Sequence, residues 1–108
     1  MIRHIVTFRF SATDAEGRAA AGAELRAALE PLGAGIPGVR SLEVGLDDGR
    51  VPGHWDAALV SVHDSAEALA AYQVHPDHLA ALGVVAALVE AKSVVDYPIG
   101  DATDESAR

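Results

Sequence analysis

The segment Tyr72-Gln73-Val74-His75-Pro76-Asp77-His78 contains the side chains of this sequence that are best suited to chemistry. One phenol and two imidazoles, all able to carry or move protons, lie within these seven residues. A neutral histidine beside a tyrosine hydroxyl is an acid–base pair of the kind that enzymes use for proton transfer. The segment is therefore the first candidate for a functional site.

Pro76 divides this segment between two predicted helices. A proline disfavours the α conformation at the residue before it, and it suits the first position of a new helix, where its missing N–H costs nothing. We therefore expect His75 to cap the junction and His78 to lie in the first turn of the second helix. The positive end of the helix dipole there disfavours a charged imidazole.

The composition limits the classes of function. The chain has 108 residues, which suits one compact domain. Its 16 acidic and 8 basic side chains argue against nucleic-acid or anionic-membrane partners. The absence of cysteine excludes disulfides, thiolate zinc sites and cysteine nucleophiles. The first predicted strand leaves no room for a signal peptide, and no apolar run reaches the ~20 residues that span a bilayer, so we expect a soluble, cytoplasmic protein.

Hydrophobic periodicity predicts the element order β-α-β-β-α-β. Alternating patterns predict strands at residues 2–10, 39–46, 57–63 and 91–98. Helical spacing predicts a helix over 13–32 and a second helical region that follows Asp64-Ser65, breaks at Pro76 and extends to Val89.

Turn and cap residues set the expected limits of these elements. Thr13 or Ser11 is expected to cap the first helix, and the region of Gly33 and Gly35 to end it. The polar segment 47–55 should be the longest exposed loop. The domain is expected over residues 1–99, followed by a flexible acidic tail over 100–108.

The element order is that of the ferredoxin-like α+β fold, with a four-stranded antiparallel sheet. Helices on one face of such a sheet leave the other face uncovered, and a second copy related by a two-fold axis is the economical cover. We therefore expect a homodimer. The face that it buries carries alternate residues of the first and last strands, namely Arg3, Ile5, Thr7, Val95 and Tyr97.

Four stretches of the sequence resemble the stress-responsive α/β-barrel family, the dimeric Dabb proteins. They are Ile2-Arg3-His4-Ile5-Val6, Ile36-Pro37-Gly38-Val39, the Tyr72–His78 segment, and Asp96-Tyr97. The resemblance covers nearly the whole predicted domain and implies a ferredoxin-like subunit that dimerises through its sheets. The best-understood branch of the family consists of plant polyketide cyclases similar to olivetolic acid cyclase, which catalyse an aldol condensation with no metal and no organic cofactor.

The resemblance also implies site residues. The catalytic tyrosine of the cyclases falls on Tyr72 and the catalytic histidine on His78. The histidine of the first strand falls on His4, and the aspartate that orients the catalytic histidine falls on Asp96. In this hypothesis His78 is the base, Asp96 fixes its tautomer, and Tyr72 donates to a carbonyl or enolate oxygen. The strand pattern agrees, since His4 and Asp96 both occupy helix-facing positions.

The expected substrate pocket combines the helix-facing side of the sheet with the inner side of the first helix. Its predicted lining is Val6, Phe8, Leu25, Leu29, Arg40, Leu42, Leu59 and Val94. The first helix lacks the aromatic residues that help to wall the cyclase pocket, so the resemblance implies nothing about the selectivity of this chain for a substrate.

Two functions stay open at this point. One is a cofactor-free acid–base enzyme that acts on a small carbonyl or phenolic metabolite. The other is a non-catalytic stress-responsive or small-ligand-binding dimer, in which Tyr72 and the HPxH segment serve the fold. A cavity of ~300 Å³ or more that touches Tyr72 and His78 favours the enzyme.

The remaining histidines have less specific interpretations. His4 alone is better explained as a hydrogen-bonded core residue, because buried polar groups normally find partners. Asp96 at a core-facing position also needs a partner, for which His78 or His4 is the natural candidate. A metal site of His75, His78 and His4 is a weaker hypothesis, because the proline pushes His75 out of the helix and no HExxH-type pattern is present. His54 in a loop and His63 at a strand end are expected to be exposed.

Overall fold

The computed structural model describes residues 1–100 of the chain. The strands and helices follow the predicted order, with a short helix added after the first. The second helical region is divided at Pro76, as predicted. The strands are β1 (Ile2–Phe10), β2 (Val39–Leu46), β3 (Ala57–His63) and β4 (Val89–Pro98). The helices are α1 (Ala15–Leu29), α2 (Leu32–Gly35), α3 (Ala66–Val74) and α4 (Pro76–Leu88).

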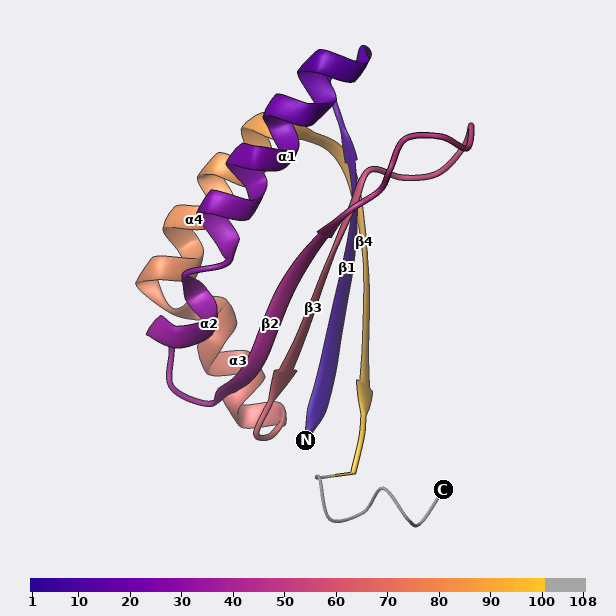
Figure 1. The fold of residues 1–108 in the computed structure, drawn as a ribbon. Helices are drawn as coiled ribbons and strands as arrows, with labels where there is room; N and C mark the ends of the chain where they lie inside the picture. The colour runs from indigo at the N-terminus through magenta and orange to yellow at the C-terminus, as the bar shows by residue number, and fades with distance from the viewer. Residues whose placement is uncertain (101–108) are drawn as a thin grey trace.

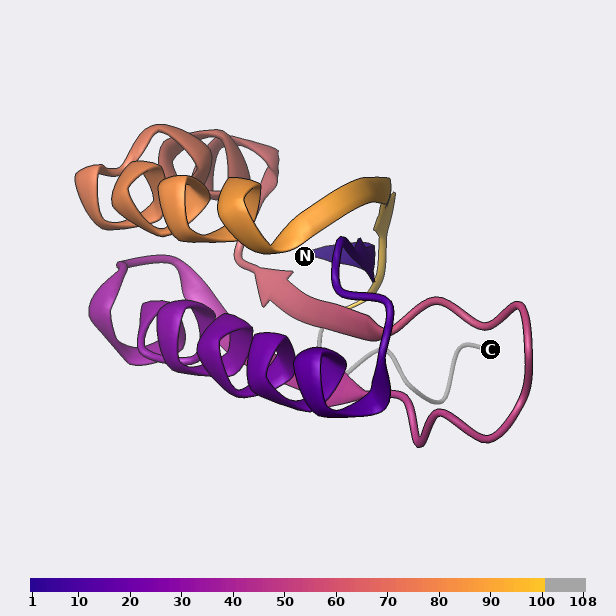
Figure 2. The same cartoon turned by 90° about the horizontal axis from the view of Figure 1, so that it is seen from above.

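The strands form one antiparallel sheet in the order β2-β3-β1-β4. All the helices of residues 1–100 lie on the same side of this sheet, and within that range the other side carries none (Figure 1). Seen from above, α1 and α4 run side by side over the sheet (Figure 2). The predicted ferredoxin-like α+β fold is therefore confirmed. None of the described helices is long and apolar enough to cross a membrane.

The core lies between the sheet and the helices. Val6, Phe8 and Phe10 alternate along β1 and are all buried, as the period-2 pattern requires. They pack beneath Leu25 and Leu29 of α1, and the Leu25 side chain is 0% exposed. Most other buried residues are small or aliphatic, so the helices approach the sheet closely.

The first helix differs from the prediction at both ends. Its N-cap is Asp14, whose carboxylate accepts a 2.7 Å hydrogen bond from the Gly17 N–H, in place of Thr13 or Ser11. A carboxylate is the better cap because it also meets the positive end of the helix dipole. The helix ends at Leu29, and Gly33 and Gly35 belong to α2 instead of ending α1.

The junction around Pro76 has the predicted form. His75 is extended (φ −63°, ψ 139°) and serves both as the C-cap of α3 and as the N-cap of α4. Its Nδ1 accepts a 3.1 Å hydrogen bond from the Asp77 N–H. The histidine therefore takes the role that Ser, Thr or Asp usually has at a helix start.

The side of the sheet without helices presents apolar residues to solvent. Ile5 of β1 pairs with Val60 of β3 and Val95 of β4, so the three side chains form a row across the sheet. Val95 is 57% exposed and Tyr97 is 36% exposed. We call Ile5, Val60, Val95 and Tyr97 the open-face cluster.

Gly38 and Gly83 should respond in opposite ways to substitution by alanine. Gly38 has φ +86°, and a Cβ there would lie 2.9 Å from the Cβ of Ala68. We expect Gly38→Ala to lower the free energy of unfolding by about 1–2 kcal/mol or more. A Cβ at Gly83 of α4 meets nothing within 4 Å, so Gly83→Ala should raise it by about 0.5–1 kcal/mol. Urea denaturation of both variants checks this, and equal midpoints would contradict it.

Candidate functional site

Three of the predicted polar residues line one cavity between the sheet and the helices. The cavity has a volume of about 230 Å³, and its polar lining residues include His4, Tyr72 and His78. The rest of its lining is mainly apolar and comprises Val6, Phe8, Leu29, Leu59, Gln73, Leu82, Val85, Lys92 and Val94. The cavity touches both Tyr72 and His78 but is smaller than the ~300 Å³ expected for a ligand pocket. An engineered cavity of ~150 Å³ holds benzene, so this one suits a ligand of about one substituted ring.

Tyr72 is positioned as a hydrogen-bond donor. It lies in α3 and is 1% exposed, with its ring 4.8 Å from that of His63 and 4.6 Å from that of His78. Burial raises the pKa of Tyr72 to about 12, so the phenol stays protonated at neutral pH. Its hydroxyl makes no hydrogen bond to any residue of the described part of the chain. A ligand oxygen is therefore free to accept from it.

His78 has one ring nitrogen whose lone pair is not used by a hydrogen bond to residues 1–100. Its Nδ1 lies 3.0 Å from the carbonyl oxygen of Gln73. A carbonyl only accepts, so Nδ1 carries the hydrogen and Nε2 keeps its lone pair. Burial is the largest cause that lowers the pKa of His78, opposed by this hydrogen bond and assisted by the charges of His4 and Lys92. The imidazole is thus neutral and able to take a proton near pH 7.

Asp96 interacts with His4 and not with His78. The two residues are directly opposed in the β1–β4 register, and His4 Nδ1 lies 2.5 Å from Asp96 Oδ1. Opposed residues on one sheet face have their Cβ atoms ~5 Å apart, which suits a short carboxylate. The expectation that Asp96 orients His78 is therefore wrong for this structure. A backbone carbonyl holds His78 instead, and the carboxylate holds a buried histidine beneath Tyr72.

His63 is buried, and the expectation of an exposed side chain is wrong. The residue is 0% exposed, and its Nε2 lies 2.8 Å from the Ser61 hydroxyl. Its Nδ1 has no hydrogen-bond partner among the described residues. The alternation of β3 explains this burial, because His63 follows Leu59 and Ser61 on the helix-facing side and Tyr72 covers the strand end. That alternation was visible in the sequence and outweighs the position at a strand end. His54 is exposed, as expected.

The predicted pocket lining agrees with the cavity only in part. Val6, Phe8, Leu29, Leu59 and Val94 line it. Leu25, Arg40 and Leu42 do not.

Leu25 is fully buried within the core, and Leu42 packs against α2 near Gly33. Arg40 is exposed and forms a 2.6 Å ion pair with Asp64, because the register of β2 shifts between Val39 and Ser41. Bulges of this kind carry no clear signal in one sequence. The lining residues missed from the sequence are Gln73, Leu82, Val85 and Lys92.

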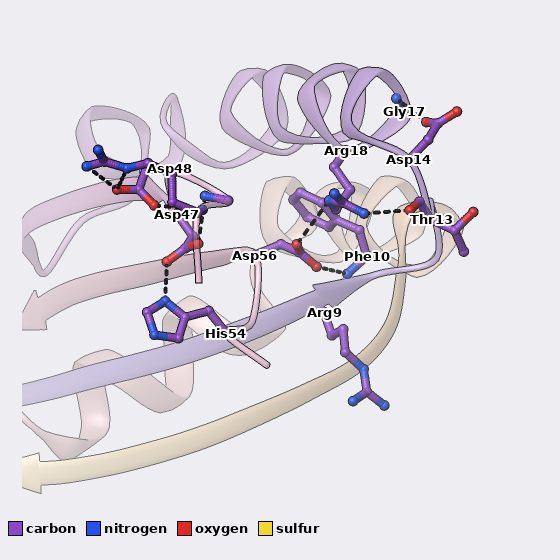
Figure 3. Close-up of polar contacts among 12 residues, drawn as sticks. Arg9, Phe10, Thr13, Asp14, Gly17, Arg18, Asp47, Asp48, His54 and Asp56 are labelled. Atoms are coloured by element: carbon purple, nitrogen blue, oxygen red, sulfur yellow. Dashed lines mark hydrogen bonds and ion pairs between the residues drawn. The ribbon is translucent and has the colours of Figure 1, made fainter. Parts of the chain in front are cut away.

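A second hollow, of about 420 Å³, lies at the end of β1 that carries Arg9 and Phe10, beside the β2–β3 loop. Its polar groups bind one another (Figure 3). Asp56 accepts from the Phe10 N–H at 2.8 Å and lies 3.8 Å from Arg18, while Asp47 meets His54 at 3.1 Å. These contacts fasten the loop to β1 and α1, so we interpret the hollow as structural.

The metal hypothesis gains no support from the histidine positions. His75 Nδ1 accepts from the Asp77 N–H, and His78 Nδ1 donates to the Gln73 carbonyl. In residues 1–100 no group of three or more His, Asp or Glu side chains is arranged to hold a metal ion.

Comparison with known proteins assigns the family. The model of the stress responsive A/B barrel domain, Dabb, matches residues 2–99. The chain belongs to this family. No protein of curated description matches its sequence.

Solved structures agree with this assignment. A dimeric protein of unknown function from Bacteroides fragilis is 33% identical, with a TM-score of 0.78 over 91% of this chain and 95% of that one. A dimeric ferredoxin-like protein of unknown function from Thermobifida fusca is 34% identical, with a TM-score of 0.77 over 91% and 90%. A hydroxynitrile lyase from Passiflora edulis is similar at 19% identity, with a TM-score of 0.74 over 93% and 94%. At that identity the likeness shows the fold alone.

Acid should destabilise the protein partly through His63. Burial is the largest cause that lowers the pKa of His63 from its ordinary value of 6.5. Below pH 6.5 the unfolded chain then binds more protons than the native one, so stability falls as the pH drops from 6.5 toward the native pKa. We expect a smaller difference between the urea midpoints at pH 7.5 and pH 5.5 in His63→Phe than in the wild type. An unchanged difference would show that His63 does not contribute.

Proposed function

We propose that this Dabb-domain protein is a homodimer whose subunit cavity carries out cofactor-free acid–base chemistry on a small carbonyl or phenolic metabolite. The observation that carries the proposal is the pairing of two complementary groups in one mainly apolar cavity. The Tyr72 hydroxyl is protonated and unpaired with the described residues, and His78 presents the lone pair of Nε2. A cytoplasmic location stays a prediction from the sequence.

The proposed chemistry is abstraction of a proton next to a carbonyl group. His78 Nε2 takes the proton, and the negative charge moves to the carbonyl oxygen, where Tyr72 donates a hydrogen bond. Apolar walls strengthen that hydrogen bond, because they keep water from competing for the oxygen. The resulting enolate can attack a second carbonyl, as in an aldol condensation, and the protonated His78 returns its proton to the new alkoxide. His4, held by Asp96, packs edge to face against the Tyr72 ring at a centroid distance of 6.3 Å.

Single substitutions test this assignment with little change in packing. Tyr72→Phe removes only the hydroxyl, and His78→Asn keeps a short amide that is able to donate to the Gln73 carbonyl. For any poly-β-keto or phenolic compound that the wild type converts, we expect Tyr72→Phe to lower kcat about 100-fold and His78→Asn about 100-fold or more. Product formation over a panel of such compounds is the measurement. Equal rates in all three proteins would remove both residues from the mechanism.

The small volume of the cavity favours a second candidate function. A cavity of about 230 Å³ leaves little room for two reacting groups and the motion between them. In this alternative the dimer binds a small ligand without converting it. The alternative predicts saturable binding of a phenol, seen by NMR titration, together with no turnover on the same panel.

The open-face cluster supports the homodimer. Its residues lie on three neighbouring strands, and apolar side chains in such a row mark a protein interface when no helix of residues 1–100 covers them. We expect the wild type to elute as a dimer, and Val95→Lys to shift it toward monomer, because a buried lysine without a partner costs several kcal/mol. Val84→Lys on α4, where Val84 is 39% exposed, is the matched control and should stay dimeric. Light scattering coupled to size-exclusion chromatography measures both variants. A dimeric Val95→Lys would exclude this interface.

A further inference from the structure

The cavity has one side chain with a full positive charge on its lining. That residue is Lys92 of β4, and it is the only lysine of the chain. Lys92 pairs with Phe8 in the β1–β4 register, which places both side chains on the helix-facing side of the sheet. Lys92 is exposed, so it lies at the rim of the cavity, whereas Phe8 lies inside it.

Lys92 differs from the other basic residues in having no partner. Each arginine in the described part of the chain meets a carboxylate or a phenol: Arg3 with Tyr97, Arg9 with Glu90, Arg18 with Asp56, Arg26 with Glu30, Arg40 with Asp64, and Arg50 with Asp48. Lys92 forms neither an ion pair nor a side-chain hydrogen bond with any residue between 1 and 100. The chain has twice as many acidic as basic side chains, so an unpaired cation is a distinctive feature of this rim.

Neither acidic residue of β4 neutralises this charge, because Glu90 is paired with Arg9 at 2.8 Å and Asp96 is remote from Lys92. Asp96 lies four residues further along the strand, or about 13 Å at ~3.3 Å per residue. That distance exceeds the Debye length of ~8 Å at physiological salt. Asp96 is also bound to His4. The charge of Lys92 is directed instead toward the cavity, where it helps to lower the pKa of His78.

We propose that Lys92 is the anchor for the carboxylate of the ligand, so that the substrates of this site are small carboxylic acids with an apolar body. The inference rests on the proposed function, because it names the substrate class of the same cavity. The carboxylate lies at the rim beside Lys92, and the body fills the space between Val6, Phe8 and Leu82. A phenol or carbonyl oxygen at the other end reaches Tyr72. One ammonium matches a monoanion, whereas a phosphate dianion needs more donors than the lining supplies.

Two probes that differ only in charge test the anchor. 4-Hydroxybenzoate carries the carboxylate, and 4-hydroxybenzamide is its neutral counterpart. In NMR titrations of the full chain at low salt, the wild type should bind the benzoate roughly three- to tenfold more tightly than the benzamide. Lys92→Met should abolish this preference, and Lys92→Arg should keep it. Arg50→Met changes the net charge equally in the exposed β2–β3 loop, outside the cavity lining, and should also keep it.

The single lysine allows a readout that does not depend on affinity. Reductive methylation with ¹³C-formaldehyde labels the Lys92 amine and the N-terminus only. The Lys92 signal should shift on titration with the benzoate and not with the benzamide. Equal binding of both probes to the wild type and to Lys92→Met would overturn the anchor and leave the proposed function standing. If neither probe binds to the wild type, a phenolic ligand is excluded for the cavity, and the anchor fails with it.

Discussion

The break in the chain at Pro76 determines the geometry of the candidate site. A proline cannot donate to the preceding turn, so the last carbonyl groups of α3 lose their helical partners. The Gln73 carbonyl finds a new partner in the imidazole of His78, one turn into α4. The same bond fixes the hydrogen on Nδ1 and leaves the lone pair on Nε2. A feature that ends a helix thus also selects the tautomer of a histidine on the cavity lining, and no carboxylate is needed for that purpose.

A second constraint is that polar groups between the sheet and the helices must find partners. His4 and Asp96 satisfy each other because strand register sets them opposite one another. His63 is satisfied at Nε2 by Ser61 but not at Nδ1 within the described residues. A buried group left in this way costs stability. The cluster of His63, His4, Tyr72 and His78 rings therefore includes a group that costs stability, and such local cost is typical of functional sites.

The sequence predicts the fold well because each element carries its own signal. Alternation along Ile2–Phe10 and the cap at His75 depend on neighbouring residues only, and both agree with the structure. The errors concern relations between elements. Arg40 lies outside the pocket because the register of β2 shifts beside it. Asp96 binds His4 because strand pairing sets the two residues opposite one another. Neither relation can be predicted from the spacing of residues that are neighbours in the sequence. Lys92 was missed for another reason, since a charged residue on an edge strand is usually read as a solvated one.

The position of Lys92 makes the two ends of the cavity chemically different. Its inner end presents a phenol and a neutral imidazole, and its rim presents an ammonium. In a chain with a formal net charge of −8, the long-range field repels anions. At physiological salt that field is screened within ~8 Å, so the nearest charge decides which ligand end stays at the rim. A carboxylate held there places the opposite end of a ring-sized ligand against Tyr72 and His78. Orientation, and not only affinity, is therefore what an anchoring cation contributes to proton transfer in so small a cavity.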